Sequence, residues 1–556
     1  MTDILLIQPP VRDFYFTAKR SIPYGLACIA ASSSRQGFTV EILDGLATSK
    51  TRNIPLPAEM DYLSGFYGNP DLSPFALFHQ YKHFGYSFEH IGKQAKASGA
   101  FLVGISSLFS AYSPEAIETA NVVKTWLPSC QIVIGGHHPT ALPEAVMACS
   151  AVDFAIRGEG EDSLPILAAI LKTDKSPSEA LLSTVPGLVF RKIDGSLHVP
   201  KPAWMLNLDD QPPPAMHLVR MDYYRRGHTG ASVIVAGRGC PMACTYCSLS
   251  QQSGTPYRRK SLENVLSEIE QSIESTGAGF IDFEDENLSF DRKWFMALLS
   301  AIQARFPEPR PELRAMNGLF PASLDKEMIA AMKAAGFTAL NLSLGTTSAA
   351  QLRRFHRPDM TSAFEKAIDI AEDCGLTAVG YIIVAAPFQN PFESVEDLLY
   401  LASLRTLAGV SVFYPSPGSA DYDLCQRLEI LPDQFSLMRS SCLPLSHTTT
   451  RLESVTLMRL GRILNFMKAL IDLKIDFETE TTDVSVCDVT LNSRRKMGIR
   501  LLQMFLTDGK IRGLGPDGNF YEHDISTALT QRFRKGLFSK KIKGVVASNP
   551  IPQGFT

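Results

Sequence analysis

The first two hundred residues alternate short apolar runs, rich in β-branched residues, with longer amphipathic segments. Such alternation predicts a parallel sheet with helices on both faces, and so an α/β fold. The expected strands are Ile4–Ile7, Thr39–Leu43, Phe101–Ser106, Gln131–Ile134 and Asp153–Ile156. A hairpin is expected at Gly187–Val199, around Asp194-Gly195. The pattern therefore predicts one α/β domain over residues 1–200.

Polar and glycine-rich turns follow the expected strands of this first domain. Parallel strands end at the same edge of a sheet, and open α/β sheets bind ligands there. The candidate ligand-binding residues in these turns are Gln8, Pro9, Ser106, Ser107, Gly135, Gly136, His137, Glu159 and Gly160. Residues 46–90 interrupt the alternation with aromatics, prolines and glycines, so we expect an irregular insertion over one edge of the sheet.

A second alternation of strands and helices begins after a linker at residues 201–227. The linker contains the stiff stretch Asn207–Pro214, which ends in three consecutive prolines. Six strands are expected, at 232–236, 280–284, 312–316, 339–344, 378–384 and 410–414. Helices such as Leu262–Ser275 and Ser323–Ala335 fill the gaps between them. Six such units predict a partial (β/α)6 barrel over residues 228–420, with its active site at the carboxyl ends of the strands.

The alternation stops after Gly418, and the remaining chain has helical periodicity. Leu452–Leu473 and Leu491–Leu506 have the spacing of amphipathic helices. We therefore expect residues 421–556 to form a mainly helical cap that covers the substrate.

Composition and charge exclude several classes of protein. Hydrophobic residues make up 45% and charged residues 20% of the 556 residues, which is typical of a globular protein. A net charge of -3 argues against nucleic-acid binding, which normally requires a broad basic surface. The longest apolar runs are too short to span a bilayer, and the start MTDILLIQPP does not resemble a signal peptide. We expect a cytoplasmic protein with no stable membrane insertion.

Three of the ten cysteines crowd into one segment directly after the first barrel strand. Cys240, Cys244 and Cys247 have CxxxCxxC spacing, and thiolates are ligands that suit zinc and iron–sulfur clusters. A closed site of either kind needs a fourth ligand, but the next cysteine is Cys374 and the next histidine is His356. Three ligands therefore favour a four-iron, four-sulfur cluster whose fourth iron is open to a small molecule.

Residues 230–420 resemble the radical S-adenosylmethionine (SAM) superfamily, and the three cysteines match its cluster motif. The resemblance implies that the open iron binds the amino and carboxylate groups of SAM, which is then cleaved reductively. It places Tyr246 beside the adenine of SAM and Glu284, Asp285 and Glu286 near its amino group. Further SAM contacts are expected from Ser343, Gly345 and Val384, at the ends of the fourth and fifth barrel strands.

Two stretches of the barrel depart from the superfamily pattern. Thr346 and Thr347 lie where many relatives carry a glutamate after the glycine of the fourth strand. The fifth strand lacks the glycine that relatives often place before the proline, which is Pro387 here. These departures concern the SAM contacts on the two strands and leave the cluster motif intact.

Residues 1–200 resemble the Rossmann-like cobalamin-binding domain that precedes the barrel in one large class of radical SAM enzymes. The motifs that carry this resemblance are Gln8-Pro9-Pro10, Pro23-Tyr24-Gly25-Leu26, Gly135-Gly136-His137, Gly158-Glu159-Gly160-Glu161 and Pro415-Ser416-Pro417-Gly418. The resemblance implies cobalamin as a second cofactor. The chain has no Asp-x-His-x-x-Gly motif, so the lower face of cobalt is expected to carry water or no axial ligand.

The combined resemblance implies methylation of an unactivated carbon in a small-molecule or natural-product precursor, with two SAM molecules used per turnover. One SAM gives its methyl group to cobalamin, and the other is cleaved at the cluster to start radical chemistry. The electron for cleavage implies a reducing partner such as flavodoxin or ferredoxin. No side chain is assigned as a catalytic acid or base.

Alternatives to methylation stay open at this point. One is a cobalamin-dependent enzyme that closes or rearranges a ring without methyl transfer, and another is a non-catalytic corrinoid or iron–sulfur carrier. A methylthiotransferase or an enzyme with an auxiliary cluster is disfavoured, because it would need a second group of cysteines. The remaining cysteines are too scattered along the chain for that; they include Cys28, Cys130, Cys149, Cys425, Cys442 and Cys487.

Overall fold

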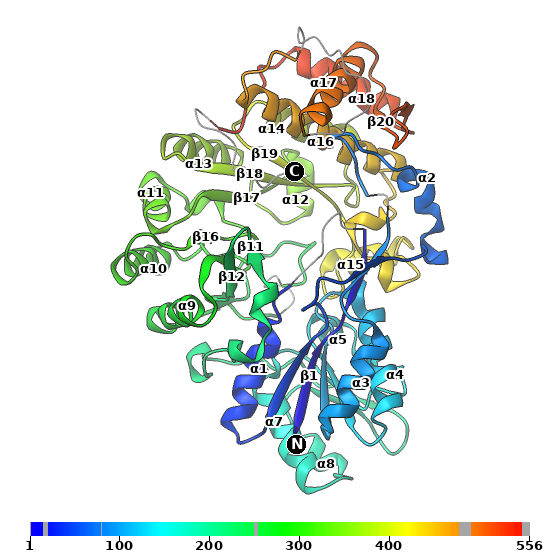
Figure 1. The fold of residues 1–556 in the computed structure, drawn as a ribbon, viewed down its shortest axis with the longest axis vertical. Helices are drawn as coiled ribbons and strands as arrows, with labels where there is room; N and C mark the ends of the chain where they lie inside the picture. The colour runs from blue at the N-terminus through cyan, green and yellow to red at the C-terminus, as the bar shows by residue number, and fades with distance from the viewer. Residues whose placement is uncertain (1, 15–20, 79, 250–253, 478–490, 547–556) are drawn as a thin grey trace.

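The computed structural model describes residues 2–14, 21–78, 80–249, 254–477 and 491–546. Cys487 lies outside the described residues. In Figure 1 the N-terminal sheet occupies the lower part of the molecule, the strands of the second domain the middle, and helices α16, α17 and α18 the top. None of the described helices combines the length and the apolar character that a bilayer crossing requires.

The first domain is a seven-stranded sheet with helices on both faces. Its parallel strands are β1 Ile4–Gln8, β3 Val40–Asp44, β6 Leu102–Ser106, β7 Gln131–Gly135 and β8 Phe154–Ile156. The order β3-β1-β6-β7-β8 is that of flavodoxin-like sheets. In such sheets the order of the strands reverses at one point, which lies between β1 and β6 here, and ligands bind at that point. The antiparallel hairpin of β9 Leu188–Arg191 and β10 Leu197–His198 extends the sheet. All five predicted strands and the hairpin are confirmed, the strand bounds within one residue.

Two pairs of helices bury the faces of this sheet. Helices α1 Tyr24–Arg35 and α7 Gly160–Thr173 cover one face, and α3 Phe88–Ser98 and α4 Ser113–Trp126 cover the other (Figure 1). Leu26 of α1 and Leu164 of α7 share one apolar cluster, while Ile91 of α3 and Ala116 of α4 belong to a second. The sheet is therefore buried on both sides, as its nearly continuous apolar strands require.

Residues 46–90 do not simply cover an edge of the first sheet. They form β4 Thr51–Asn53, α2 Ser64–Tyr67 and β5 Lys82–Phe84, and β5 pairs with β2 Val11–Asp13 in a separate small sheet. Met60, Leu63 and Phe75 are fully buried in the same core cluster as the barrel and the C-terminal helices. The expected insertion therefore also reaches the far end of the chain, where its aromatic residues Tyr67 and Phe75 are buried.

The second domain has six parallel strands and the helices between them. The strands are β12 Thr229–Ile234, β15 Ala278–Phe283, β16 Glu312–Arg314, β17 Ala339–Gly345, β18 Thr377–Val384 and β19 Leu407–Val412. Two isolated β-bridges, between Leu313 and Phe337 and between Leu319 and Leu342, connect the region of β16 to that of β17. All six predicted strands are confirmed within three residues, and the architecture is a partial (β/α)6 barrel.

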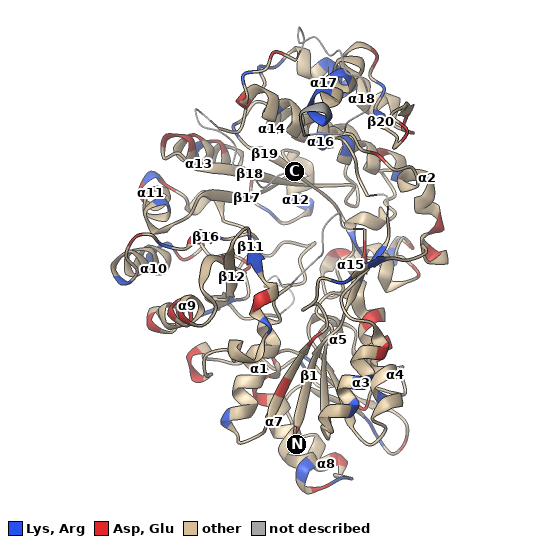
Figure 2. Ribbon diagram, viewed as in Figure 1, with Lys and Arg blue, Asp and Glu red and all other residues tan. Residues whose placement is uncertain are grey.

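Most of the barrel helices begin at polar caps. The barrel helices include α9 Leu262–Thr276, α10 Arg292–Arg305, α11 Lys326–Ala335, α13 Thr361–Asp373 and α14 Pro391–Ala402. The side chains of Ser261, Asp291 and Asp325 each accept a hydrogen bond from a backbone N–H in the first turn of the helix that follows. On the outside, Arg305 of the basic helix α10 pairs with Glu263 and Glu270 of the acidic helix α9 (Figure 2).

The C-terminal segment is mainly helical, as predicted, and packs on the outer wall of the barrel. It contains α15 Ala420–Arg427, α16 Arg451–Asp472, α17 Leu491–Asp508 and α18 Thr527–Phe538. Helix α16 lies along β19, the last strand of the open barrel. The Asn465 side chain accepts from the Ala408 N–H (2.8 Å) and donates to the Ala408 carbonyl (2.9 Å). The amide thus satisfies the backbone groups of an otherwise unpaired strand edge.

Gly461 is a position at which α16 packs closely on β19. A Cβ atom there would lie 2.6 Å from Cγ2 of Val410, well inside van der Waals contact. We predict that Gly461→Ala lowers the free energy of unfolding by about 1–3 kcal/mol, the usual cost of overpacking a buried contact. Denaturant unfolding measures this loss. Gly25→Ala is the matched control, since nothing lies within 4 Å of a Cβ at that helical position; equal midpoints for both variants would contradict the close contact.

Candidate functional site

The three motif cysteines lie on a loop, residues 239–248, that we call the cysteine loop. It follows β13 Gly237–Arg238, which pairs with β14 Arg258–Arg259 in a two-stranded ribbon. The loop therefore lies between the two strands of this ribbon. Gly239 starts the loop with a φ of +80°, and a Cβ there would overlap the Pro256 carbonyl oxygen. Glycine is therefore required for the chain to turn into the loop. The Cys247 N–H donates to the Cys244 carbonyl (3.2 Å), which closes a turn between two of the cysteines.

Two polar side chains lie close to the sulfur atoms of the cysteine loop. Asn287 Nδ2 lies 3.9 Å from the Sγ of Cys240, and Arg357 Nη1 lies 3.9 Å from the Sγ of Cys244. Burial raises the pKa of Cys247 to about 12 and also raises the pKa of Cys240. Buried thiols ionise when they bind a metal, so the site favours metal ligands over reactive free thiolates.

The donor geometry fits a cluster better than a single ion. Zinc needs all its ligands to converge on one point, with Zn–S distances of about 2.3 Å. Within the described ranges, no three side chains of the types His, Cys, Asp and Glu converge in that way. The nine cysteines in these ranges are all free of disulfides. The cysteine loop supplies three thiols, and a cluster can take them as ligands because each thiolate binds a different iron.

The three acidic residues after β15 have different surroundings. Glu284 accepts from Asn317 Nδ2 (2.8 Å). Asp285 is buried, accepts from the Ala236 N–H (3.0 Å) and pairs with Arg259 (3.2 Å), so both of its oxygens are used within the protein. Glu286 accepts from the Gly239 backbone, while its Oε2 is buried without a hydrogen-bond partner. Of the three, Glu286 faces the cysteine loop with a free acceptor.

Tyr246 is held by a residue that the sequence did not single out. Its hydroxyl accepts from Arg357 Nη1 (3.1 Å), and its ring packs edge-on against Phe355, with the centroids 4.9 Å apart. Arg357 Nη2 also donates to the Ser343 carbonyl, and the Nε of Arg357 is buried without a partner. Gly345 lies beside this side chain, and its φ of +80° is a conformation that favours glycine.

Arg357 therefore brings Tyr246, Ser343 and Cys244 together. Val384 is fully buried at the end of β18, where its carbonyl accepts from the Phe413 N–H (2.9 Å). No local periodicity or motif marks Arg357, which follows the short helix α12 Ala349–Arg354, so only the folded chain reveals it.

Thr346 and Thr347 contact a buried carboxylate from a different element. The Asp397 side chain on α14 accepts from the Thr346 hydroxyl (2.8 Å) and from the N–H and hydroxyl of Thr347 (both 2.6 Å). Burial raises the pKa of Asp397 to about 6. An acidic group therefore still lies close to the end of β17, although the sequence departs from the superfamily pattern there. Asp397 of α14 supplies it, and the two threonines donate hydrogen bonds to it.

The turns at the carboxyl edge of the first sheet lie together. Ser106 pairs with Gly135 across β6 and β7, and Gly136 has a φ of +117°. A Cβ on Gly136 would lie 2.7 Å from the Ser107 carbonyl oxygen, so the two turns touch. The Ser107 hydroxyl and the His137 Nε2 are buried without partners, and burial lowers the pKa of His137. Unpaired polar atoms of this kind fit a ligand rich in amides, such as a corrin ring.

The other residues predicted for this edge are already engaged within the protein. Gln8 Nε2 donates to the Ser21 carbonyl (2.6 Å), and Pro9 is buried beside the Gly45 turn. Gly160 begins α7, and a Cβ there would lie 3.1 Å from the Ile29 side chain of α1. Both carboxylate oxygens of Glu159 are hydrogen-bonded, to arginines of the second domain and to the Met205 N–H.

The carboxyl edges of the two sheets meet at the Pro415–Gly418 turn. The Ser416 hydroxyl donates to that of Ser248, the residue after Cys247 (3.0 Å). A ring nitrogen of His137 bonds to the Pro417 backbone, and a Cβ on Gly418 would lie 3.4 Å from Ala141. The cysteine loop and the His137 turn therefore border the same space.

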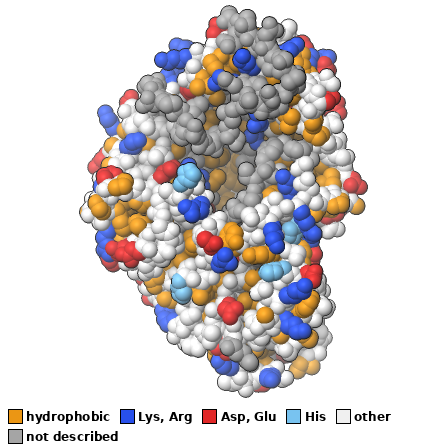
Figure 3. Space-filling model, in the orientation of Figure 1, with side chains coloured by type: hydrophobic (Ala, Val, Ile, Leu, Met, Phe, Trp, Pro, Cys, Tyr) orange, Lys and Arg blue, Asp and Glu red, His pale blue; other side chains and the backbone are white. Residues whose placement is uncertain are grey.

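Large apolar side chains are exposed at these strand ends, with exposed fractions from 39% for Phe388 to 51% for Leu108. Four of them follow strands of the two sheets, and Leu445 belongs to the C-terminal segment. These side chains are Leu108, Met316, Phe388, Tyr414 and Leu445. Figure 3 shows the surface hollowed near the middle of the molecule, with hydrophobic side chains in the visible part of the hollow.

Two family descriptions match this chain in the order of its domains. The B12 binding domain matches residues 77–168, and the radical SAM superfamily matches residues 234–401. The cobalamin-dependent S-adenosylmethionine radical enzyme OxsB, solved with aqua-cobalamin and S-adenosylmethionine bound, has a similar fold. The TM-score is 0.63 at 13% identity, over 91% of this chain and 72% of that one.

Three curated relatives are similar over much of the chain. An uncharacterized methyltransferase of Pyrococcus horikoshii is 25% identical over 75% of this chain and 81% of its own length. Cytidylyl-2-hydroxyethylphosphonate methyltransferase of Streptomyces wedmorensis is 25% identical over 78% and 84%. Anaerobic magnesium-protoporphyrin IX monomethyl ester cyclase of Cereibacter sphaeroides is 27% identical over 54% and 49%.

The domain order, the open three-cysteine site and the paired carboxyl edges agree with these matches. The cofactors are those of both domains: a [4Fe-4S] cluster, S-adenosyl-L-methionine and cobalamin. The chain is a radical SAM enzyme with a B12 binding domain, and it is similar to methyltransferases.

Proposed function

We propose that this enzyme methylates an unactivated carbon of a small molecule and uses two SAM molecules per turnover. The observation that carries the proposal is the meeting of the two carboxyl edges, where Ser248 contacts Ser416 and Pro417 contacts His137. A methyl carrier on the first sheet and a radical generator on the second would face one substrate across this space. The similarity to two methyltransferases supports the same reaction.

The side chains divide the binding work between the two cofactor edges. When bound, the cluster and SAM supply a radical that removes hydrogen, and cobalamin supplies the methyl group. Cys240, Cys244 and Cys247 would hold the cluster, and Glu286 would accept the amino group of SAM, because an ammonium removed from water needs charged acceptors. Tyr246, held by Arg357, would pack beside the adenine.

On the opposite side, Ser107 and His137 would offer their free polar atoms to the corrin amides. Burial lowers the pKa of His137 and so favours its neutral form, in which the ring can hydrogen-bond to cobalamin without placing a charge in the site. The Ser106 and Gly135–Gly136 turns would let the backbone approach the flat ring closely. The exposed apolar side chains around the hollow would exclude water, which protects radical chemistry from quenching.

A reductant must deliver one electron to the cluster, and we propose a flavodoxin or ferredoxin in the cytoplasm for this role. The apolar hollow favours substrates with an extended hydrophobic part. A second candidate reaction is ring closure without methyl transfer, favoured by the similarity to a tetrapyrrole cyclase, of which this chain covers about half.

Replacement of one cluster ligand tests the site directly. We predict that Cys244→Ser abolishes SAM cleavage and the cubane signal in paramagnetic resonance and Mössbauer spectra after anaerobic reconstitution. Cys149→Ser is the control, because Cys149 is another free cysteine, and it contacts Asn121 in the first domain, away from the cysteine loop. Full turnover by the Cys244→Ser enzyme would refute the cluster assignment.

The unpaired carboxylate of Glu286 gives a prediction for SAM affinity. Glu286→Gln should weaken SAM binding roughly tenfold, since a hydrogen bond to a charged group contributes about 1.5–3 kcal/mol. Equilibrium dialysis with the reconstituted enzyme measures the change. Glu284→Gln serves as the control, because its carboxylate is paired with Asn317. Equal affinities for both variants would remove Glu286 from the SAM site.

Products distinguish methylation from ring closure. With iron, sulfide, cobalamin, reductant and substrate candidates of graded hydrophobicity, methylation yields S-adenosylhomocysteine and 5′-deoxyadenosine in equal amounts. Chromatography with mass detection quantifies both. Production of 5′-deoxyadenosine alone during substrate turnover would exclude methylation and support the cyclase reaction, while absence of both would support a carrier protein.

A further inference from the structure

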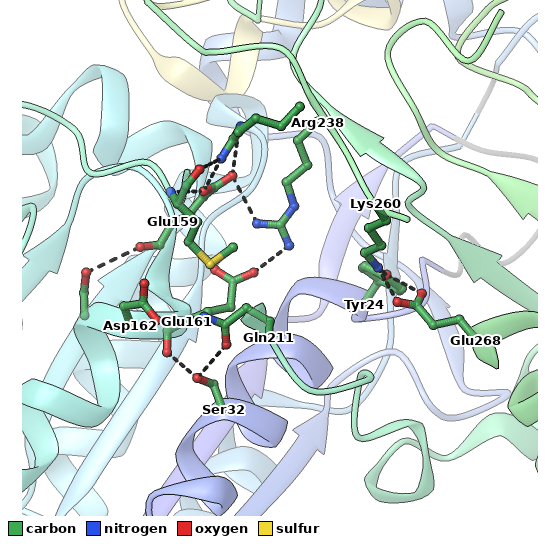
Figure 4. A network of polar contacts seen from close by, with 12 residues as sticks. Tyr24, Ser32, Glu159, Glu161, Asp162, Gln211, Arg238, Lys260 and Glu268 are labelled. Atoms are coloured by element: carbon green, nitrogen blue, oxygen red, sulfur yellow. Dashed lines mark hydrogen bonds and ion pairs between the residues drawn. The ribbon is translucent and has the colours of Figure 1, made fainter. Parts of the chain in front are cut away.

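Two motifs of the first domain make contacts that cofactor binding does not explain. Tyr24 belongs to the Pro23–Leu26 motif and Glu159 and Glu161 to the Gly158–Glu161 motif, and both motifs reach side chains of the barrel (Figure 4). The contacts join residues up to 244 positions apart in the chain. We call them together the interdomain network.

The first part of the interdomain network centres on Tyr24 at the start of α1. Its hydroxyl donates to Glu268 Oε2 of α9 (2.8 Å) and accepts from Lys260 Nζ (2.9 Å). Lys260 also pairs with Glu268, and all three side chains are buried. A single tyrosine of the first domain thus completes a buried lysine–glutamate pair of the second.

The second part surrounds Glu159 and Glu161, which follow β8. Arg258 makes a two-pronged contact with Glu159 (2.7 and 2.9 Å), and Arg238 bonds to Glu159 (3.1 Å) and Glu161 (2.6 Å). Burial alone would raise the pKa of Glu159, but the hydrogen bonds from Arg258 and the charge of Arg238 outweigh it, so the pKa falls. Glu159 is therefore ionised at neutral pH.

The position of the two arginines links these contacts to the cluster. Arg238 lies two residues before Cys240, and Arg258 lies on the strand paired with it, so both stand on the ribbon that carries the cysteine loop. The side chains of the four partners are between 5% and 19% exposed. Desolvated pairs of this kind fix geometry more than they add stability, because the cost of removing charge from water offsets their attraction.

The linker between the domains is tied into the same network. Ser32 of α1 donates to the Glu161 carbonyl (2.6 Å) and to Gln211 Oε1 (3.0 Å), and Gln211 donates to Asp162 (2.7 Å) (Figure 4). Arg258 also donates to the Met205 carbonyl (2.5 Å). A small cavity lined by Cys28, Arg238, Lys260 and Glu268 lies between the two parts.

We infer that Tyr24, Glu159 and Glu161 are positioning residues, which hold the ribbon of the cysteine loop at a fixed distance from the cobalamin edge. The inference deepens the proposed function and rests on it, since methyl transfer between two cofactor sites needs a constant separation. The three residues act through the arginines and Lys260 and touch no reacting atom. Their substitution should therefore leave both cofactors bound but broaden the distribution of distances between the cluster and cobalamin.

The test measures that distance in the full-length reconstituted enzyme. Pulsed dipolar resonance between cobalt(II) of bound cobalamin and the reduced cluster gives a distance distribution. We expect a narrow distribution for the wild type and at least a twofold broader one for Glu159→Gln and for Tyr24→Phe, which removes one hydroxyl only. Iron and cobalamin contents should stay within 20% of wild type, roughly the scatter between preparations.

Product yields provide the second readout. In the variants, methylated product per 5′-deoxyadenosine should fall at least tenfold, because SAM cleavage continues while transfer fails. Glu327→Gln, which breaks an exposed pair with Arg292, is the matched control and should match the wild type in both measurements. The charge exchange Glu161→Arg with Arg238→Glu should recover part of the narrow distribution that Glu161→Arg alone loses.

The outcomes separate this inference from the proposed function. Unchanged distance distributions in Glu159→Gln and Tyr24→Phe would overturn the positioning role, whatever reaction the enzyme performs. Loss of cobalamin from Glu159→Gln with an unchanged cluster environment would overturn it too, because Glu159 would then be a cofactor ligand. If the wild type forms no methylated product, the proposed reaction fails, and the distance measurement still decides the role of the network.

Discussion

The separation of the two carboxyl edges is the constraint on which the chemistry of this fold depends. The cysteine loop is fixed to the first domain near both of its ends. At one end Arg238 pairs with Glu159 and Glu161, and at the other Ser248 contacts the Pro415–Gly418 turn that touches His137. Because these contacts hold the loop at two points, a cluster bound to the loop would keep a fixed position relative to cobalamin on the first sheet.

Much of the fold follows from local patterns in the sequence. The strands of both sheets are apolar runs bounded by turns, and their periodicity depends on burial alone, so their bounds could be predicted within three residues. The cysteine spacing is equally local. The contacts of Glu159 could not be predicted, because its partner Arg258 lies 99 positions away and no periodicity links the two residues. Residues that a family motif attaches to a cofactor turn out here to join two domains.

The segment at residues 46–90 shows a different limit of sequence reasoning. Its aromatic content indicates burial, but composition does not say against which surface. The Tyr62 hydroxyl bonds to the Cys442 carbonyl, and Arg459 of α16 pairs with Asp71, so the segment fastens the first domain to the C-terminal helices. Arg357 illustrates the same limit within the site. Its three contacts come from two distant parts of the chain, the cysteine loop and β17, and no local sequence pattern predicts them.

The amide of Asn465 has a consequence beyond the stability of the barrel wall. An open barrel ends in a strand whose outward N–H and carbonyl groups could template a strand from another molecule. Because Asn465 occupies both groups of Ala408, and α16 lies along the strand, β19 offers little to a foreign chain. The amide and the helix together therefore hinder this strand edge from pairing with a second molecule, which protects the open side of the barrel from self-association.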